Sequence, residues 1–260
     1  MPYVMHHGVN LHYRIEGSGP SLLLVHGHTN SVEGWYEGGF VDGLQPHYRL
    51  IMPDLPGHGQ SGKPHGVEYY SRDRLVGGLL AVLDAAGAER AMYWGYSMGA
   101  MLGFATALMA PERITAWILG GMHPYGDPSG RPNGRVAPLR QGMAAYLAWI
   151  EASGQAAMTP ERRARMLATD AEALADAAEG TEGYRNQTEA LARLTRPTLL
   201  YCGTADGLFE GAQRAASAVA GAQFVPLAGL NHGQASGRGD LVLPHVLPFL
   251  AEATTQTMKA

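Results

Sequence analysis

Residues 95–99, Gly-Tyr-Ser-Met-Gly, constrain the fold of this chain more than any other stretch. They follow an apolar run at 91–94 and precede a helix-forming run at 100–105. A serine in a sharp strand-to-helix turn has strained backbone geometry, and the flanking positions, where strand and helix nearly touch, accept only residues with almost no side chain. The two glycines meet that demand. The turn places Ser97 at a helix N-terminus, where free N–H groups favour developing negative charge, so Ser97 is a candidate nucleophile.

The composition is that of an ordinary globular protein. Apolar residues make up 46% and charged residues 16% of the 260 residues, and α/β proteins of this length are commonly one domain. No apolar run approaches the roughly 20 residues that cross a bilayer, so we expect no membrane span.

The net charge of −4 and the pI near 6.2 argue against a strongly basic surface, and the longest basic cluster is Arg162 with Arg163. We therefore expect a small-molecule substrate and no nucleic acid as partner. Residues 1–7 lack the charged n-region and the long apolar h-region of a signal peptide, which favours a cytoplasmic location.

The single cysteine, Cys202, lies in an apolar, strand-like run at 198–202 and has no internal disulfide partner. A buried, unreactive thiol is the simplest interpretation. Because C-x-x-C and H-E-x-x-H patterns are both absent, we expect no metal.

The spacing of apolar residues predicts an α/β fold with a mostly parallel sheet. In residues 3–16, apolar and polar residues alternate on both sides of a turn-like segment, which indicates an antiparallel hairpin. Short apolar runs and helical patterns then follow one another, which is typical of βαβ units with helices on both faces of the sheet. The predicted strands are 21–26, 48–53, 91–95, 114–120, 197–203 and 223–227, and the predicted helices are 32–44, 71–86, 98–110, 208–220 and 240–253.

This alternation is interrupted once. Residues 123–134 have the Pro- and Gly-rich composition of a loop, and residues 139–194 show helical patterns without a strand candidate. We therefore predict a core formed by residues 1–121 and 197–260, with residues 122–196 inserted between two strands as a helical cap.

A serine nucleophile needs a base to take its proton and a third group to orient that base. His232 is the candidate base, because it follows the last predicted strand in a polar, glycine-containing loop. Asp206 and Asp127 each follow a strand and precede His232, so both give the order Ser, Asp, His. Asp206 is favoured, since Asp127 lies in a segment where an Asp usually forms a turn.

Acyl transfer also needs donors aimed at the oxyanion. The N–H of Met98, directly after the nucleophile, is one candidate. The N–H of His28 is the other, because Gly27 lets the loop after the first parallel strand approach closely. For His28, a role of the backbone alone is favoured over a role of the side chain.

With these residues in view, the chain resembles the α/β-hydrolase superfamily over about residues 8–121 and 197–253. The resemblance rests on five motifs in the family's order, at residues 24–28, 54–61, 95–99, 203–206 and 231–232. It implies an eight-stranded, mostly parallel sheet, a helical cap and a cofactor-free site with Ser97, Asp206 and His232 as triad. His28 stands where one lipase and esterase branch has a Gly-Gly run, which disfavours that branch, and Asn231 stands where the family often has glycine.

The expected reaction is hydrolysis of a carboxylic ester of a small or medium hydrophobic substrate through an acyl-enzyme. A serine at position 97 argues against the epoxide hydrolases and haloalkane dehalogenases of the superfamily, which use an aspartate there. A carbon–carbon bond hydrolase, a lactone hydrolase and a small-molecule receptor remain as alternatives with the same triad. Candidate substrate-binding residues are Trp35, Tyr96, Tyr125, Tyr146 and Trp149, although aromatic residues at helical spacing more often pack than contact a ligand.

Overall fold

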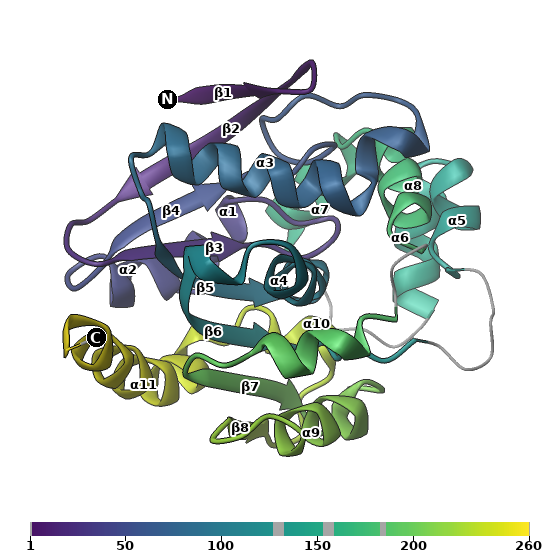
Figure 1. Ribbon diagram of the computed structural model, residues 1–260. Coiled ribbons are helices and arrows are strands. Elements are labelled where there is room, and N and C mark those ends of the chain that lie inside the picture. Colours follow the sequence, from purple (N-terminus) through teal and green to yellow (C-terminus); the bar gives the residue numbers. More distant parts are fainter. Residues whose placement is uncertain (1, 127–132, 153–158, 183–185, 260) are drawn as a thin grey trace.

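The computed structural model describes residues 2–126, 133–152, 159–182 and 186–259, which form one eight-stranded sheet with helices on both faces (Figure 1). The strand order is β1-β2-β4-β3-β5-β6-β7-β8, in which β1 with β2 and β2 with β4 are antiparallel and the other pairs are parallel. The strands are β1 (Tyr3–His6), β2 (Val9–Glu16), β3 (Ser21–Val25), β4 (Arg49–Pro53), β5 (Ala91–Tyr96), β6 (Ile114–Gly120), β7 (Thr198–Gly203) and β8 (Gln223–Leu227). The predicted fold class is confirmed.

The central strands are buried along their whole length. Every residue of β5, β6 and β7 is buried, as expected for parallel strands covered on both faces. Successive residues of β3 enter different cores, with Leu23 and Val25 on one face and Leu22 and Leu24 on the other. The apolar runs of the sequence therefore reflect two cores, one on each side of the sheet.

Each core is closed by its own helices. The first face carries α3 (Arg72–Ala85), α4 (Met98–Met109) and α9 (Phe209–Ser217), and the second carries α1 (Glu33–Glu37), α2 (Phe40–Leu44) and α11 (Gly239–Lys259). None of the described helices is both long enough and apolar enough to span a membrane.

The predicted helix 208–220 ends earlier, at Ser217, as α9, and two other helices differ more from the sequence prediction. The predicted helix 32–44 is divided into α1 and α2, because Gly39 adopts a φ of +71° that a continuous helix does not allow. The predicted helix 240–253 extends to Lys259 as α11. Thr254 and Thr255 continue it with side-chain hydroxyls that donate to the carbonyl oxygens of Leu250 and Ala251.

Between β6 and β7 the described residues are helical and contain no strand. They form α5 (Val136–Arg140), α6 (Met143–Ala152), α7 (Pro160–Leu167), α8 (Ala171–Gly180) and the 3-10 helix η4 (Thr188–Arg193). The helices α5 to α8 have a small core of their own around Leu139, Leu147 and Leu174, and they gather beside the carboxyl ends of the parallel strands (Figure 1).

A buried carboxylate joins this helical segment to the sheet domain. Asp176 of α8 accepts a hydrogen bond from the N–H of Gly66, at 2.6 Å, and pairs with Arg140, at 2.5 Å. Gly66 directly precedes the 3-10 helix η1 (Val67–Tyr70). These contacts therefore hold the helical segment in place beside the carboxyl ends of the strands.

The turn between β5 and α4 brings backbone atoms into close contact. A Cβ at Gly99 would collide with the carbonyl oxygen of Val25, and one at Gly95 would lie 2.6 Å from the nitrogen of Ala100. Backbone atoms of a central strand cannot move aside as a flexible side chain can. Only glycine fits these two positions.

We expect Gly99→Ala to lower the free energy of unfolding by about 3 kcal/mol, because overpacking here must displace β3 or α4. Chemical denaturation followed by circular dichroism measures the change. Gly237→Ala is the matched control, since Gly237 is exposed with no atom within 4 Å of an added Cβ, and its effect should stay within about 0.5 kcal/mol. Equal stabilities of the two variants would contradict this account.

Candidate active site

Ser97 lies in the sharp turn between β5 and α4, with a φ of +54° and a ψ of −115°. This backbone conformation is strained for a residue with a Cβ. Hydrogen bonds on both sides hold it, because the Ser97 N–H donates to the carbonyl oxygen of Gly120, at 2.8 Å, and the Ser97 carbonyl accepts from Met101, at 2.9 Å. The backbone hydrogen bonds therefore fix the position of the Ser97 side chain at the carboxyl end of the sheet.

The three residues predicted for a triad lie together. The Oγ of Ser97 is 2.9 Å from Nε2 of His232, and Nδ1 of His232 is 2.7 Å from Oδ2 of Asp206. An ionised carboxylate only accepts hydrogen bonds, so Nδ1 carries the proton and Nε2 is free to accept from the serine hydroxyl. Asp127, the alternative acid, lies outside the described residues.

A short helix positions His232. Helix α10 (His232–Ala235) is capped by Asn231, whose side chain accepts from the N–H of Gln234 at 3.0 Å, while the Asn231 N–H donates to the Gln234 side chain at 2.9 Å. The hydroxyl of Tyr96 donates to the His232 carbonyl oxygen at 2.6 Å. Asn231, which departs from the glycine of the family pattern, thus has a role as a helix cap.

Asp206 is held as a carboxylate. Burial alone raises the pKa of Asp206, but the hydrogen bond from His232 and the electrostatic attraction to it, with the N–H of Leu208 at 3.0 Å, bring that pKa below its usual value. The thiol of Cys202 donates to the same oxygen that binds His232, at 3.5 Å, and burial raises the pKa of the Cys202 thiol. Cys202 is buried, as its apolar surroundings in the sequence predict, but nothing in the sequence indicates this contact across the turn.

The two predicted oxyanion donors flank the nucleophile. Neither the N–H of His28 nor that of Met98 has a hydrogen-bond acceptor among the described residues. The loop that carries His28 passes close to the serine, since a Cβ at Gly27 would lie 3.2 Å from Cβ of Ser97. Both groups are therefore available to an oxygen atom bound beside Ser97.

The side chain of His28 also makes a contact that the sequence did not indicate. Its Nε2 donates to the carbonyl oxygen of Leu174 in α8, at 2.9 Å, and this bond leaves Nδ1 unprotonated. Burial, with a smaller contribution from the charge of Arg135, lowers the pKa of His28 to about 3. The imidazole is thus neutral and links the loop to the helical segment.

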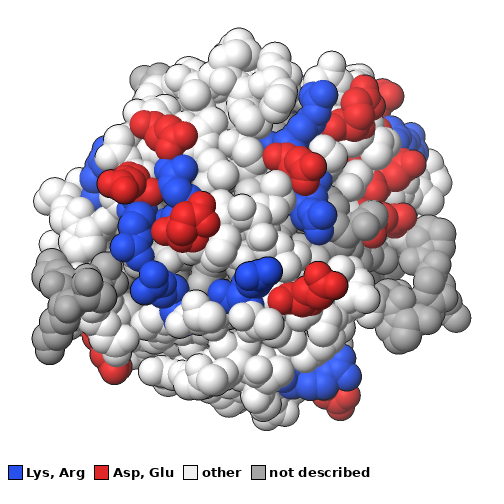
Figure 2. Space-filling model, viewed as in Figure 1, with Lys and Arg blue, Asp and Glu red and all other residues white. Residues whose placement is uncertain are grey.

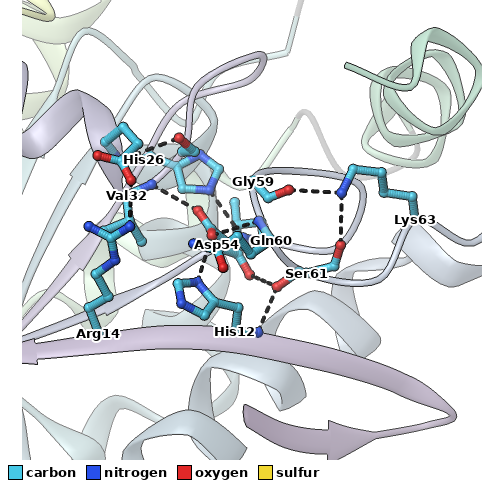
Figure 3. Close-up of polar contacts among 12 residues, drawn as sticks. His12, Arg14, His26, Val32, Asp54, Gly59, Gln60, Ser61 and Lys63 are labelled. Atoms are coloured by element: carbon cyan, nitrogen blue, oxygen red, sulfur yellow. Dashed lines mark hydrogen bonds and ion pairs between the residues drawn. The ribbon is translucent and has the colours of Figure 1, made fainter. Parts of the chain in front are cut away.

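A buried network anchors the end of this loop (Figure 3). Asp54, directly after β4, accepts hydrogen bonds from the N–H groups of Val32 and Gln60 and from Nδ1 of His12, at 2.8, 2.9 and 2.8 Å. The Ser61 hydroxyl donates to the Asp54 carbonyl at 2.6 Å. These contacts lie inside the fold, and they fix the loop that ends at Val32 against two strands.

Two cavities meet at Ser97, and both also border His28 and Arg135. The smaller has a volume of about 90 Å³ and is lined by Trp35, Tyr96, Tyr146, Arg162 and His232, among others. The larger, of about 500 Å³, is lined by Met98, Met101, Met122, Tyr125 and Trp149, among others. All five predicted substrate-binding residues border one of the two cavities.

Several lining residues were missed. Arg135 and Arg162 border the cavities although nothing in the local sequence distinguishes them from other arginines.

Trp35 also packs between Phe40 and Trp94, with ring centroids at 5.3 and 5.6 Å. Among the described residues there is no cluster of three or more His, Cys, Asp or Glu side chains placed to hold a metal ion.

Comparison with known proteins gives concordant results. A family model described as alpha/beta hydrolase fold matches residues 20–148. The enol-lactonase of Burkholderia xenovorans LB400 superposes with a TM-score of 0.84 and 28% identity over 96% of this chain and 100% of that chain. A putative 2-succinyl-6-hydroxy-2,4-cyclohexadiene-1-carboxylate synthase of Bacillus subtilis is 29% identical over 220 residues, 76% of this chain and 79% of the relative.

A third relative is similar over a shorter region. The pimeloyl-[acyl-carrier protein] methyl ester esterase of Vibrio campbellii is 35% identical over 109 residues, which are 42% of this chain and 39% of the esterase. The sheet order, the turn at Ser97 and the similarity over the whole chain agree with one another. The chain belongs to the α/β-hydrolase superfamily.

Proposed function

We propose that this protein is a serine hydrolase that cleaves carboxylic esters of small or medium hydrophobic substrates through an acyl-enzyme on Ser97. The observation that carries the proposal is the continuous hydrogen-bonded chain from Ser97 Oγ through His232 to Asp206, with distances of 2.9 and 2.7 Å. A serine so placed next to an oriented base is an activated nucleophile. Its position between two cavities gives a substrate access to it.

In the first step Ser97 Oγ attacks the carbonyl carbon while Nε2 of His232 takes the hydroxyl proton. Asp206 keeps the proton on Nδ1 and stabilises the imidazolium that forms. The tetrahedral intermediate collapses when the carbon–oxygen bond to the alcohol breaks, and His232 returns its proton to that oxygen. Water then attacks the acyl-enzyme with His232 again as base, which releases the acid and restores Ser97.

The oxyanion of each tetrahedral intermediate needs donors that are already in place. The N–H groups of His28 and Met98 serve this purpose in our proposal. Met98 is the first residue of α4, where the N–H has no intrahelical partner and the helix dipole favours negative charge. No metal or cofactor is required by these steps.

The helical segment, residues 122–196, acts in this proposal as the cap over the site. It supplies Tyr125 and Trp149 to the larger cavity and Tyr146 to the smaller one. The sheet domain contributes Trp35 and Tyr96 to the smaller cavity. The apolar lining of the larger cavity suits a hydrophobic acyl group.

Lactone hydrolysis is the second candidate. A lactone is an internal ester, so the same attack, collapse and hydrolysis apply, with acid and alcohol remaining in one product. The specific observation in its favour is the similarity, over almost the whole chain, to an enol-lactonase. Turnover of lactones and of open esters by one preparation distinguishes the two candidates.

We expect Ser97→Ala to lower kcat for 4-nitrophenyl hexanoate by about 10⁴-fold or more, because the acyl-enzyme can no longer form. An alkyl phosphonate should label Ser97 in the wild type, as mapped by mass spectrometry. Ser217→Ala is the matched control, since Ser217 is an exposed residue of α9 whose hydroxyl bonds only its own helix. A variant without Ser97 that still turned over esters at the wild-type rate would exclude this mechanism.

We expect Asp206→Asn to lower kcat by about 10³–10⁴-fold with little change in KM, because the amide can donate to Nδ1 and then stabilises the wrong tautomer of His232. Steady-state rates on the same ester measure this. Asp127→Asn should leave kcat near the wild-type value. The opposite result, loss with Asp127→Asn and retention with Asp206→Asn, would reverse the assignment of the acid.

A further inference from the structure

Two arginines border the smaller cavity beside Ser97. Arg135 directly precedes α5, and Arg162 lies in the first turn of α7. The hydrogen bonds that fix these residues are made by their backbone N–H groups, which donate to side-chain oxygens of Asn133 and Thr159. Within the described ranges, neither guanidinium has an ion-pair partner.

No acidic side chain of the described residues offsets these charges at the cavity wall. Among the described residues that line the two cavities at Ser97, none is Asp or Glu. His28 is neutral there, because burial lowers its pKa to about 3. Asp206 lies behind His232 and is engaged by it. The site is therefore electropositive although the whole chain has a net charge of −4.

Several surface arginines, in contrast, form ion pairs. On the face shown in Figure 2, basic side chains stand beside acidic ones. In α7 itself, Arg163 pairs with Glu151 and Arg165 pairs with Glu37. Arg162 also borders an outer cavity that contains Glu33 and Glu37, but these carboxylates are paired with Arg14 and Arg165. Arg162 is thus left for a ligand.

The base identifies which part of the substrate meets these arginines. His232 borders the smaller cavity and is absent from the lining of the larger one. Since His232 must return its proton to the departing oxygen, the alcohol part of the substrate lies on its side. The larger, methionine-lined cavity is then left to the acyl chain.

We propose that the alcohol part of the substrate carries a carboxylate, which Arg135 and Arg162 bind in the smaller cavity. This inference rests on the proposed function and names its substrate class. The planar, forked guanidinium matches a carboxylate with paired hydrogen bonds. The smaller cavity, of about 90 Å³, has room for a short chain that carries the carboxylate.

A pair of substrates of equal shape tests the charge alone. The carboxylate 2-(hexanoyloxy)acetate and its neutral amide, 2-(hexanoyloxy)acetamide, differ only in the group that would meet the arginines. We expect the wild type to show a kcat/KM about ten- to a hundredfold higher for the carboxylate, the effect of charge-assisted hydrogen bonds. Hydrolysis is followed by titration of the released acid and corrected for the spontaneous rate.

Variants then locate the effect. Arg135→Gln and Arg162→Gln should each lower the carboxylate-to-amide ratio of kcat/KM at least fivefold, and the ratio cancels general losses of activity. Arg163→Gln is the matched control, because it removes the same charge from the same helix at an exposed, ion-paired position. The control should keep the wild-type ratio. A calorimetric titration of Ser97→Ala with the carboxylate ester measures binding without turnover and should show the same loss in the two arginine variants.

The outcomes separate the two levels of the proposal. If no ester is turned over in a Ser97-dependent manner, the proposed function itself is wrong. If esters are turned over but the ratio is near one, or is unchanged in both arginine variants, the carboxylate site is wrong and the hydrolase stands. A preference found only when the carboxylate is on the acyl side, as in ethyl hydrogen adipate against its amide, would also overturn the assignment made here.

Discussion

The close approach of α4 to the central strands is the constraint on which the site depends. The backbone at Gly99 lies against the carbonyl group of Val25, which leaves no room for a side chain. This approach forces Ser97 into a φ of +54°, lifts its side chain above the sheet edge and brings the loop at Gly27 within contact of its Cβ. The contact of Gly99 with Val25 therefore fixes the positions of Ser97, the free N–H of Met98 and the loop at Gly27 relative to one another.

Much of this fold could be predicted because buried parallel strands appear in the sequence as continuous apolar runs. The strands from β3 to β8 were located within one or two residues, and the turn at Ser97 was identified from its two glycines. The misplaced helix ends have local causes. Gly39 interrupts a pattern whose apolar spacing is continuous, and Thr254 and Thr255 extend α11 through side-chain hydrogen bonds despite their low helix propensity.

The candidate site was predictable where sequence order limits the choices, and less so where it does not. Ser97, His232 and Asp206 each follow a strand, so the parallel sheet brings them to one edge whatever the details of the loops. The contact of His28 with Leu174 depends on packing between two distant segments, and that of Cys202 with Asp206 depends on the exact shape of one turn. Neither periodicity nor spacing encodes such contacts, and only the assembled structure shows them.

The charge of the cavity illustrates this limit most clearly. Residues 161–165 contain one glutamate and three arginines. Composition alone therefore does not predict whether the face of α7 toward Ser97 is positively or negatively charged. Each residue of a helix is rotated by about 100° from the last, so a shift of one residue would exchange Arg162 for Glu161 or Arg163. Met166 of α7, packed in the core of the helical segment, and the ion pair of Arg165 with Glu37 select this rotation. The sheet domain thus holds the proposed chemistry, while the packing of the inserted helices decides which substrate charge reaches it.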